Sequence, residues 1–205
     1  YLEKISAALG KLEIVLNLFS KNISKHEKDY DFSIRQTILD NARDLKLVAN
    51  NYHNRAYSNP LLLISNLKNP LHKIAAKIQY EGGTRIEGVA LIKSEQLIGV
   101  KIDFKEKGGK EGNILVSCTT YEELEKVILR DGKFKIKRQD YYNDLKQAAI
   151  TSNEIPEASH GLRWNFAKRR MFEYGKAGYL YEDCLQQVSY EMKHNRASIT
   201  QHYLA

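Results

Sequence analysis

The chain has 205 residues and carries 32 Lys and Arg against 25 Asp and Glu, a net charge of +7 at neutral pH. This length suits one sizeable core, or one domain with a piece of a second, and the basic charge favours a polyanionic partner without requiring one. The two cysteines, Cys118 and Cys184, are too few for a disulfide scaffold or a cysteine-built zinc site, and we expect both to stay reduced in a cytosol. The longest apolar runs, such as 61–64, are far shorter than the about 20 residues of a membrane-spanning helix, so we expect no membrane contact.

The beginning of the chain predicts a helix and a linker. Residues 1–20 carry apolar side chains at helical spacing along one side, at Ile5, Leu9, Leu12, Val15, Leu16 and Phe19. Residues 21–31 are polar and charged, as linkers are. The helix is either the end of an upstream module or an element that packs on the main domain. Because the chain begins with Tyr1 and shows no leader, we expect it to be part of a longer protein.

From residue 32 onward the predicted elements follow one another closely. A helix is expected at about 33–50 with Ser33 as its cap, then a short helix between Pro60 and Pro70, and another at 71–80 that Pro70 begins. Gly82 and Gly83 break the chain. Residues 85–93 then predict a short helix that buries residues 89, 91 and 92.

The middle of the chain predicts a hairpin and several helices. The β-branched runs 100–104 and 114–117 flank a glycine-containing turn at 105–112. Thr119 or Thr120, with a glutamate three residues later, is typical of a capping box for a helix to about residue 130, which Asp131-Gly132 would close. A third strand is expected around 134–136, and further helices at 141–151, 159–174, 181–193 and 197–204. We therefore predict an α+β fold, mostly helical, with a small antiparallel sheet.

Four side chains near the C-terminus stand out. His160 and Arg163 are three residues apart, which on a helix places them on one face, about 60° apart around the axis. His194 and Tyr203 are nine apart, so on one straight helix they would lie on opposite faces, roughly 13 Å apart, and they converge only if the chain bends; Asn195 tolerates such a break. Guanidinium and imidazole donors stabilise the charge on a phosphodiester under attack, and a tyrosine can attack its phosphorus.

These residues belong to a longer pattern, by which the chain resembles the catalytic domain of the tyrosine recombinases, the phage-integrase family. The pattern is an arginine after a glycine turn, a hairpin lysine, His-x-x-Arg, a second histidine and a tyrosine nine residues later. It is met here by Arg85, Lys107, His160, Arg163, His194 and Tyr203. The resemblance covers roughly 33–205, and it implies the family's mostly helical catalytic domain at 32–205, with 1–20 as the last helix of a core-binding module and 21–31 as its linker. Each residue alone also has an ordinary structural explanation, as a helix cap, an ion pair or a packed ring.

The resemblance also implies a role for each residue. Tyr203 would be the nucleophile that forms a 3′-phosphotyrosine ester and releases a 5′-hydroxyl. Arg85 and Arg163 would bind the non-bridging oxygens, and His194 would add a hydrogen bond to them. Lys107 would protonate the leaving oxygen. His160 would help to deprotonate Tyr203 or steady the phosphate. Such chemistry needs no metal and no cofactor.

The sequence departs from the family in four places. Gly88 stands where an acidic residue is usual, and Glu87 is the expected substitute. Trp164 follows the His-x-x-Arg motif, and we expect its indole to pack beneath the site. Lys193 replaces the glycine before the second histidine. The segment between Arg163 and His194 is longer than usual and contains a basic run that we expect near DNA, at Lys168, Arg169 and Arg170.

The expected partner is double-stranded DNA at a specific recombination site. Candidate phosphate contacts, besides that basic run, are Lys133, Lys135, Lys137 and Arg138. The resemblance implies a tetramer on DNA, allows an accessory directionality factor, and suggests a cytoplasmic, nucleoid-associated protein of bacterial or phage origin. Because the chain ends two residues after Tyr203, we expect a further tail that docks on a neighbouring protomer.

Three classes of function remain open from the residues. The first is a site-specific recombinase that serves integration or excision of a mobile element or phage. The second is a topoisomerase-like enzyme that nicks and reseals DNA without exchanging partners. The third is a catalytically inactive DNA-binding relative, for which Gly88 and Lys193 are the hints.

Overall fold

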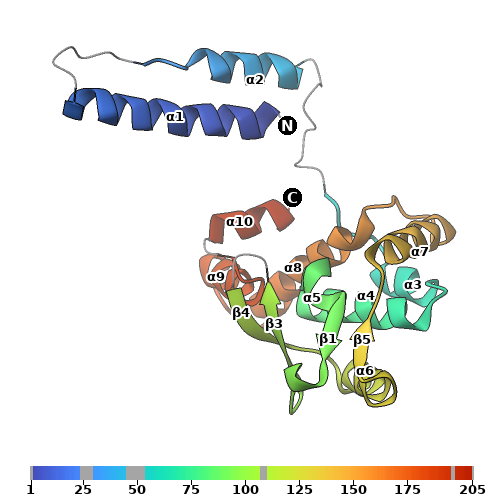
Figure 1. Ribbon diagram of the computed structural model, residues 1–205. Helices are drawn as coiled ribbons and strands as arrows, with labels where there is room; N and C mark the ends of the chain where they lie inside the picture. Colours follow the sequence, from blue (N-terminus) through green and yellow to red (C-terminus); the bar gives the residue numbers. More distant parts are fainter. Residues whose placement is uncertain (1, 24–29, 45–53, 107–109, 195–196, 205) are drawn as a thin grey trace. The chain divides into compact units, whose positions relative to one another are not determined.

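The structure is a computed structural model, and it describes residues 2–23, 30–44, 54–106, 110–194 and 197–204 (Figure 1). The chain divides into two compact units, residues 1–53 and residues 54–205. The division falls after the second helix.

The first unit is a pair of helices, α1 (Leu2–Ile23) and α2 (Ile34–Asp44). Asn17 of α1 exchanges two hydrogen bonds with the backbone of Tyr30, and Arg35 of α2 forms an ion pair with Glu13. The helix expected at 1–20 is confirmed and extends three residues further. The helix expected at 33–50 is confirmed as far as residue 44, and its last predicted turn lies outside the described residues.

The second unit begins with two proline-started helices, α3 (Pro60–Ser65) and α4 (Pro70–Gly82). Asn59 and Asn69 cap them, because each side-chain oxygen accepts a backbone N–H of the first turn. Both helices match the sequence prediction, since a proline at the first helical position needs no hydrogen-bond partner for its nitrogen.

The segment after α4 differs from the prediction. The helix expected at 85–93 ends early, as α5 (Ile86–Val89), and residues 91–93 form strand β1 (Leu91–Lys93). Ile92 is buried whereas Leu91 is 43% exposed, so the expected burial of Leu91 is wrong. The physical reason is the partner strand: β1 pairs antiparallel with β5 (Lys133–Lys135), and a strand sends successive side chains to opposite faces.

The predicted hairpin is confirmed, and it belongs to a three-stranded sheet that is separate from the β1–β5 pair. Strands β3 (Lys101–Glu106) and β4 (Lys110–Leu115) pair antiparallel, with Phe104 opposite Gly112. The 3₁₀ turn η1 (Ser94–Gln96) leads to β2 (Leu97–Ile98), which pairs with β3. Residues around 134, expected as a third strand of this sheet, pair with β1 instead, so the described residues contain two small antiparallel sheets.

The remaining helices are α6 (Cys118–Asp131), α7 (Arg138–Thr151), α8 (Ala158–Lys176), α9 (Tyr181–Glu191) and α10 (Ala197–Gln201), followed by the 3₁₀ turn η2 (His202–Leu204). Ser117 caps α6, not Thr119 or Thr120, because its side-chain oxygen accepts the backbone N–H of Thr120 (3.3 Å). Gly132 closes α6 in the left-handed conformation, as expected.

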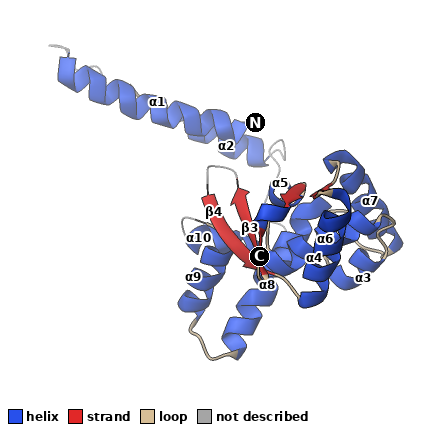
Figure 2. Cartoon of the chain, turned by 60° about the horizontal axis from the view of Figure 1, so that its bottom comes forward, coloured by secondary structure: helices blue, strands red, loops and turns tan. Residues whose placement is uncertain are grey.

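Helices α4 and α8 pack against each other in the second unit, with the hairpin strands near α8 and α9 (Figure 2). The core around them is fully buried at positions that include Leu63, Ile78, Leu124, Phe134, Leu145 and Leu162. The α+β prediction is confirmed. None of the helices that the structure describes is long and apolar enough to cross a membrane.

Candidate active site

The glycine turn after α4 requires its glycine. Gly83 ends the helix with φ +65°, and a Cβ there would lie 2.4 Å from Cδ1 of Phe166. Its carbonyl accepts a hydrogen bond from Nη1 of Arg163. The turn therefore joins α4 to α8 and delivers Arg85, two residues later, to the start of α5.

A buried polar chain holds this turn in place. Tyr141 donates its hydroxyl to Oε1 of Gln79 (2.9 Å), and Nε2 of Gln79 donates to the carbonyl of Thr84 (3.3 Å). Both side chains are almost fully buried, so neither can exchange its partner for water. The backbone next to Arg85 is therefore held by α4 and α7.

Arg163 is the largest fully buried side chain among the described residues, at 1% exposure. Its Nη2 donates to the carbonyl of Met192 (2.6 Å) and to Nε2 of His194 (3.1 Å), besides the Nη1 bond to Gly83. A buried guanidinium is tolerated only when such acceptors surround it. One side chain of α8 thus ties the glycine turn to the end of α9.

His194 has a definite proton arrangement. Arg163 can only donate, so Nε2 of His194 accepts, and the ring proton lies on Nδ1, which donates to Oγ1 of Thr200 (2.8 Å). The backbone reaches this position through Lys193, whose φ is 56°, and the amide of His194 bonds to the carbonyl of Ser189. This left-handed lysine precedes His194, whereas the bend that the sequence required lies between His194 and Tyr203; Asn195 lies outside the described residues.

Tyr203 lies against the predicted site residues. Its ring centroid is 5.4 Å from that of His160, 5.3 Å from that of His194 and 5.3 Å from that of Trp164. Cζ of Arg163 lies 5.9 Å from the same ring. The convergence of His194 and Tyr203 is therefore observed, and the indole of Trp164 packs on the tyrosine as expected.

A cavity of about 220 Å³ opens beside these residues. Its lining includes Thr84, Arg85, Glu87, Tyr142, Ser159, His160 and Arg163. Desolvation, together with the positive charges of Arg163, Arg55 and Arg85, lowers the pKa of His160 to about 4, although the residue is exposed at the surface. His160 is therefore neutral at neutral pH and can accept a proton.

The glycine at position 88 has a structural explanation. Gly88 is buried, and a Cβ there would lie 3.1 Å from Cδ1 of Phe104, so the hairpin occupies the room of a longer side chain. Glu87 lines the cavity and forms a 3.8 Å ion pair with Arg138. Lys107 lies outside the described residues, between the strands β3 and β4.

Sequence reasoning missed Thr84, Ser159 and Tyr142 in the cavity lining. Thr84 is 1% exposed, and within the described part of the chain its Oγ1 is a buried atom without a hydrogen-bond partner. The sequence could have indicated Thr84 as a site residue, because Thr84 directly precedes Arg85 in the glycine turn.

The basic residues of β5 are exposed. Lys133 and Lys135 alternate with buried Phe134, and Lys137 follows on the same side. Lys93 of β1 is the register partner of Lys133, so the paired strands gather further positive charge. These lysines stand where a polyanion could reach them.

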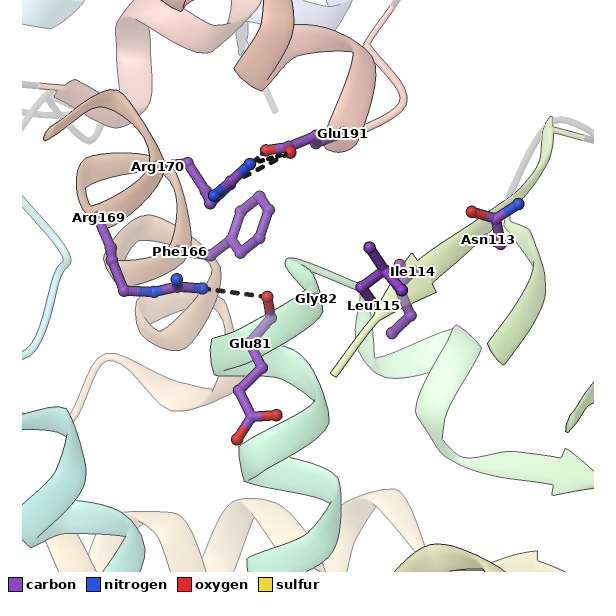
Figure 3. Close-up of a pocket in the computed structure, with 9 residues that line it drawn as sticks. All are labelled: Glu81, Gly82, Asn113, Ile114, Leu115, Phe166, Arg169, Arg170 and Glu191. Carbon is purple, nitrogen blue, oxygen red and sulfur yellow. Dashed lines mark hydrogen bonds and ion pairs between the residues drawn. The ribbon is translucent and has the colours of Figure 1, made fainter. Parts of the chain in front are cut away.

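The basic run of α8 is used within the protein (Figure 3). Arg170 forms ion pairs with Glu191 (2.6 Å) and Glu173, and Arg169 bonds to Glu173 and to the carbonyl of Glu81 (3.1 Å). They flank a cavity of about 310 Å³ lined by α4, β4, α8 and α9. Burial lowers the pKa of Lys168, which is half-buried. A structural role accounts for both arginines.

Among the residues that the structure describes, no three His, Cys, Asp or Glu side chains gather in a way that could hold a metal ion. No family model and no curated protein matches the sequence. Solved structures do match its fold. The XerH site-specific recombinase bound to palindromic difH substrate matches with a TM-score of 0.57 and 16% identity, over 71% of this chain and 46% of its own.

The catalytic domain of bacteriophage HP1 integrase matches with a TM-score of 0.57 and 19% identity, over 71% of this chain and 83% of its own. A lambda integrase dimer bound to a COC′ core site matches with a TM-score of 0.58 and 14% identity, over 74% and 48%. The chain thus spans about half the length of the XerH and lambda integrase chains that it matches. It has the fold of tyrosine recombinase catalytic domains.

Proposed function

We propose that this chain is the catalytic part of a site-specific tyrosine recombinase, which cleaves and rejoins DNA through a 3′-phosphotyrosine intermediate during integration or excision of a mobile element or phage. The observation that carries the proposal is the position of the Tyr203 ring, 5.3–5.9 Å from His160, His194 and Arg163. Helix α8, the turn after α9 and the 3₁₀ turn η2 together supply a phenol, two imidazoles and a guanidinium to one place.

In the proposed reaction the phenolic oxygen of Tyr203 attacks the phosphorus. The new bond joins that oxygen to phosphorus, and the bond from phosphorus to the 5′ oxygen breaks. A neutral His160 can take the phenolic proton, and the negative charge of a bound phosphodiester would raise its pKa from about 4 toward the range useful for a base. Lys107 would give a proton to the departing 5′ oxygen.

Arg85 and Arg163 would stabilise the charge on the non-bridging oxygens. The guanidinium of Arg163 is held by buried hydrogen bonds, and fixed donors need little reorganisation during the reaction. His194 would join them by exchanging its contact with Arg163 for one with the phosphate, after Nε2 takes up a proton. Rejoining reverses these steps with a 5′-hydroxyl as nucleophile, so it needs no external energy source.

DNA is the proposed partner, and two of the similar structures are described as complexes with difH substrate and with a core site. The exposed lysines Lys133 and Lys135 of β5, and Lys137 just after the strand, are the proposed phosphate contacts, together with Arg138 and Lys168. We assign Arg169 and Arg170 to the internal network instead. Assembly as a tetramer on DNA, an accessory directionality factor and a cytoplasmic location complete the proposal.

The test uses labelled DNA from the ends of the protein's own genetic element, with a nick beside the cleavage position so that the released fragment diffuses away. A protein–DNA band that survives denaturation is expected without added metal. Tyr203→Phe should bind the DNA and form no band, whereas the matched control Tyr190→Phe, at an exposed tyrosine of α9, should form it normally. Binding without any band in the unmodified protein would favour the inactive DNA-binding relative, and a band with nicking but no partner exchange the topoisomerase-like enzyme.

A further inference from the structure

Lys193 occupies a backbone conformation that disfavours it. Its φ of 56° lies in the left-handed region, which a glycine adopts without steric cost and a lysine does not. The resemblance to the recombinases also led us to expect a glycine at this position. A side chain kept in an unfavourable conformation raises the question of what it contacts.

The side chain of Lys193 contacts both strands of the β3–β4 hairpin. Its Nζ donates to the carbonyl of Gly112 (3.3 Å) and lies 5.5 Å from the centre of the Phe104 ring. Phe104 and Gly112 are register partners in β3 and β4, so the lysine lies on one cross-strand pair. A Cβ at Gly112 would lie 2.9 Å from Cε of Lys193, so the stem fills the space that the glycine leaves.

The neighbours of Lys193 belong to the candidate active site. The carbonyl of Met192 accepts from Arg163, and His194 contacts both Arg163 and the ring of Tyr203. Lys193 therefore has its backbone in the turn that supports the site and its side chain on β3 and β4.

The hairpin also contacts α5, the helix that follows Arg85, through Phe104. A Cβ at Gly88 would lie 3.1 Å from that ring, so α5, which begins just after Arg85, packs on the aromatic residue that Lys193 contacts. A substitution at position 193 therefore alters the packing of Phe104, the residue that lies between Lys193 and the helix that follows Arg85.

We propose that Lys193 is a positioning residue that fixes the β3–β4 hairpin relative to His194 and Tyr203. This inference rests on the proposed function, because the hairpin strands flank Lys107 in the sequence. The loss of the Lys193 contacts should impair one step above all, the protonation of the departing 5′ oxygen. The attack of Tyr203 on phosphorus should be affected much less.

A change of leaving group separates the two steps. In DNA whose bridging 5′ oxygen is replaced by sulfur, Tyr203 forms the same bond to phosphorus and the phosphorus–sulfur bond breaks. The thiolate leaves unprotonated, because a thiol is far more acidic than an alcohol. Lys193→Met keeps an unbranched stem and removes the ammonium. It should lower the rate of covalent complex formation about 10–100-fold on ordinary DNA and less than about threefold on the sulfur-containing DNA.

Further variants distinguish positioning from direct proton donation. Lys193→Arg keeps the hydrogen bond and the cation–π contact but is a poor acid, so it should retain most activity on ordinary DNA. Phe104→Leu, which removes no proton donor, should reproduce the selective loss. Lys193→Gly relieves the left-handed backbone and should fold at least as well as the unmodified protein, yet show the same loss. Lys146→Met, at an exposed lysine of α7, is the matched control and should react normally.

Equal activity of Lys193→Met and the unmodified protein on both DNAs would overturn the inference, and so would equal losses on both. An inactive Lys193→Arg would assign the proton to Lys193 itself and overturn the positioning role. If the unmodified protein cleaves neither DNA, the proposed function fails and this inference fails with it. If the unmodified protein and Lys107→Ala cleave the sulfur-containing DNA equally well, the proposed recombinase function is supported independently of the results for the Lys193 variants.

Discussion

Replacement of Arg163 by lysine tests whether this guanidinium organises the site. Arg163 reaches the carbonyls of Gly83 and Met192 and the ring of His194 from one planar group. A lysine ammonium is a single point on a flexible stem and cannot reproduce the two arms of the fork. At least one of the two carbonyls should therefore lose its charged donor.

The size of the effect follows from burial. Arg163 is 1% exposed, so water cannot replace a lost partner. A hydrogen bond to a charged group is worth about 1.5–3 kcal/mol, and we expect Arg163→Lys to lower the free energy of unfolding by about that amount for each bond lost. At about 2–4 °C per kcal/mol for a domain of this size, the loss of one bond corresponds to a fall in Tm of about 3–12 °C.

The measurement is thermal unfolding followed by near-ultraviolet circular dichroism, which reports on the packed aromatic rings around Tyr203. Arg130→Lys is the control, because Arg130 is an exposed residue paired with its neighbour Asp131, and exposed pairs contribute little. Equal Tm values for the two variants would refute the reasoning, since the buried fork would then contribute no more than a surface ion pair.

Two pH-dependent effects on stability are expected. Although burial opposes it, hydrogen bonds from His72 and the backbone amides of Lys68 and Asn69 lower the pKa of Asp144. Its contribution is therefore present above the unfolded pKa of about 3.9 and lost as the pH falls through the lower folded pKa. Asp144→Asn should lower Tm at pH 7, and its Tm difference from the unmodified protein should shrink as the pH falls below about 3.9; a constant Tm difference would contradict this. The pKa of His160 is lowered to about 4, so the unfolded chain binds this proton first and stability falls as the pH drops from about 6.5 to 4. Tm measured across that range should fall less steeply in His160→Asn, and parallel curves would contradict the assignment.

Local patterns predicted most elements of the fold. Pro60, Pro70 and Gly132 mark helix boundaries because their effect on the backbone depends on no distant partner. The helical spacing of His160 and Arg163 has the same local origin. Leu91 shows where such reasoning fails, since an apolar run of this length suits a helix or a strand, and only its pairing with residue 135 decides.

The sequence by itself determined the order of the site residues, the helices that carry them and the need for a bend between His194 and Tyr203. Only the tertiary structure decided that Arg169 and Arg170 turn to carboxylates and carbonyls within the protein, and that Lys193 reaches a glycine 81 residues away. The reason is physical: spacing along the chain reports which face of an element a side chain occupies, whereas the partner of a charged group depends on which other elements pack against that face.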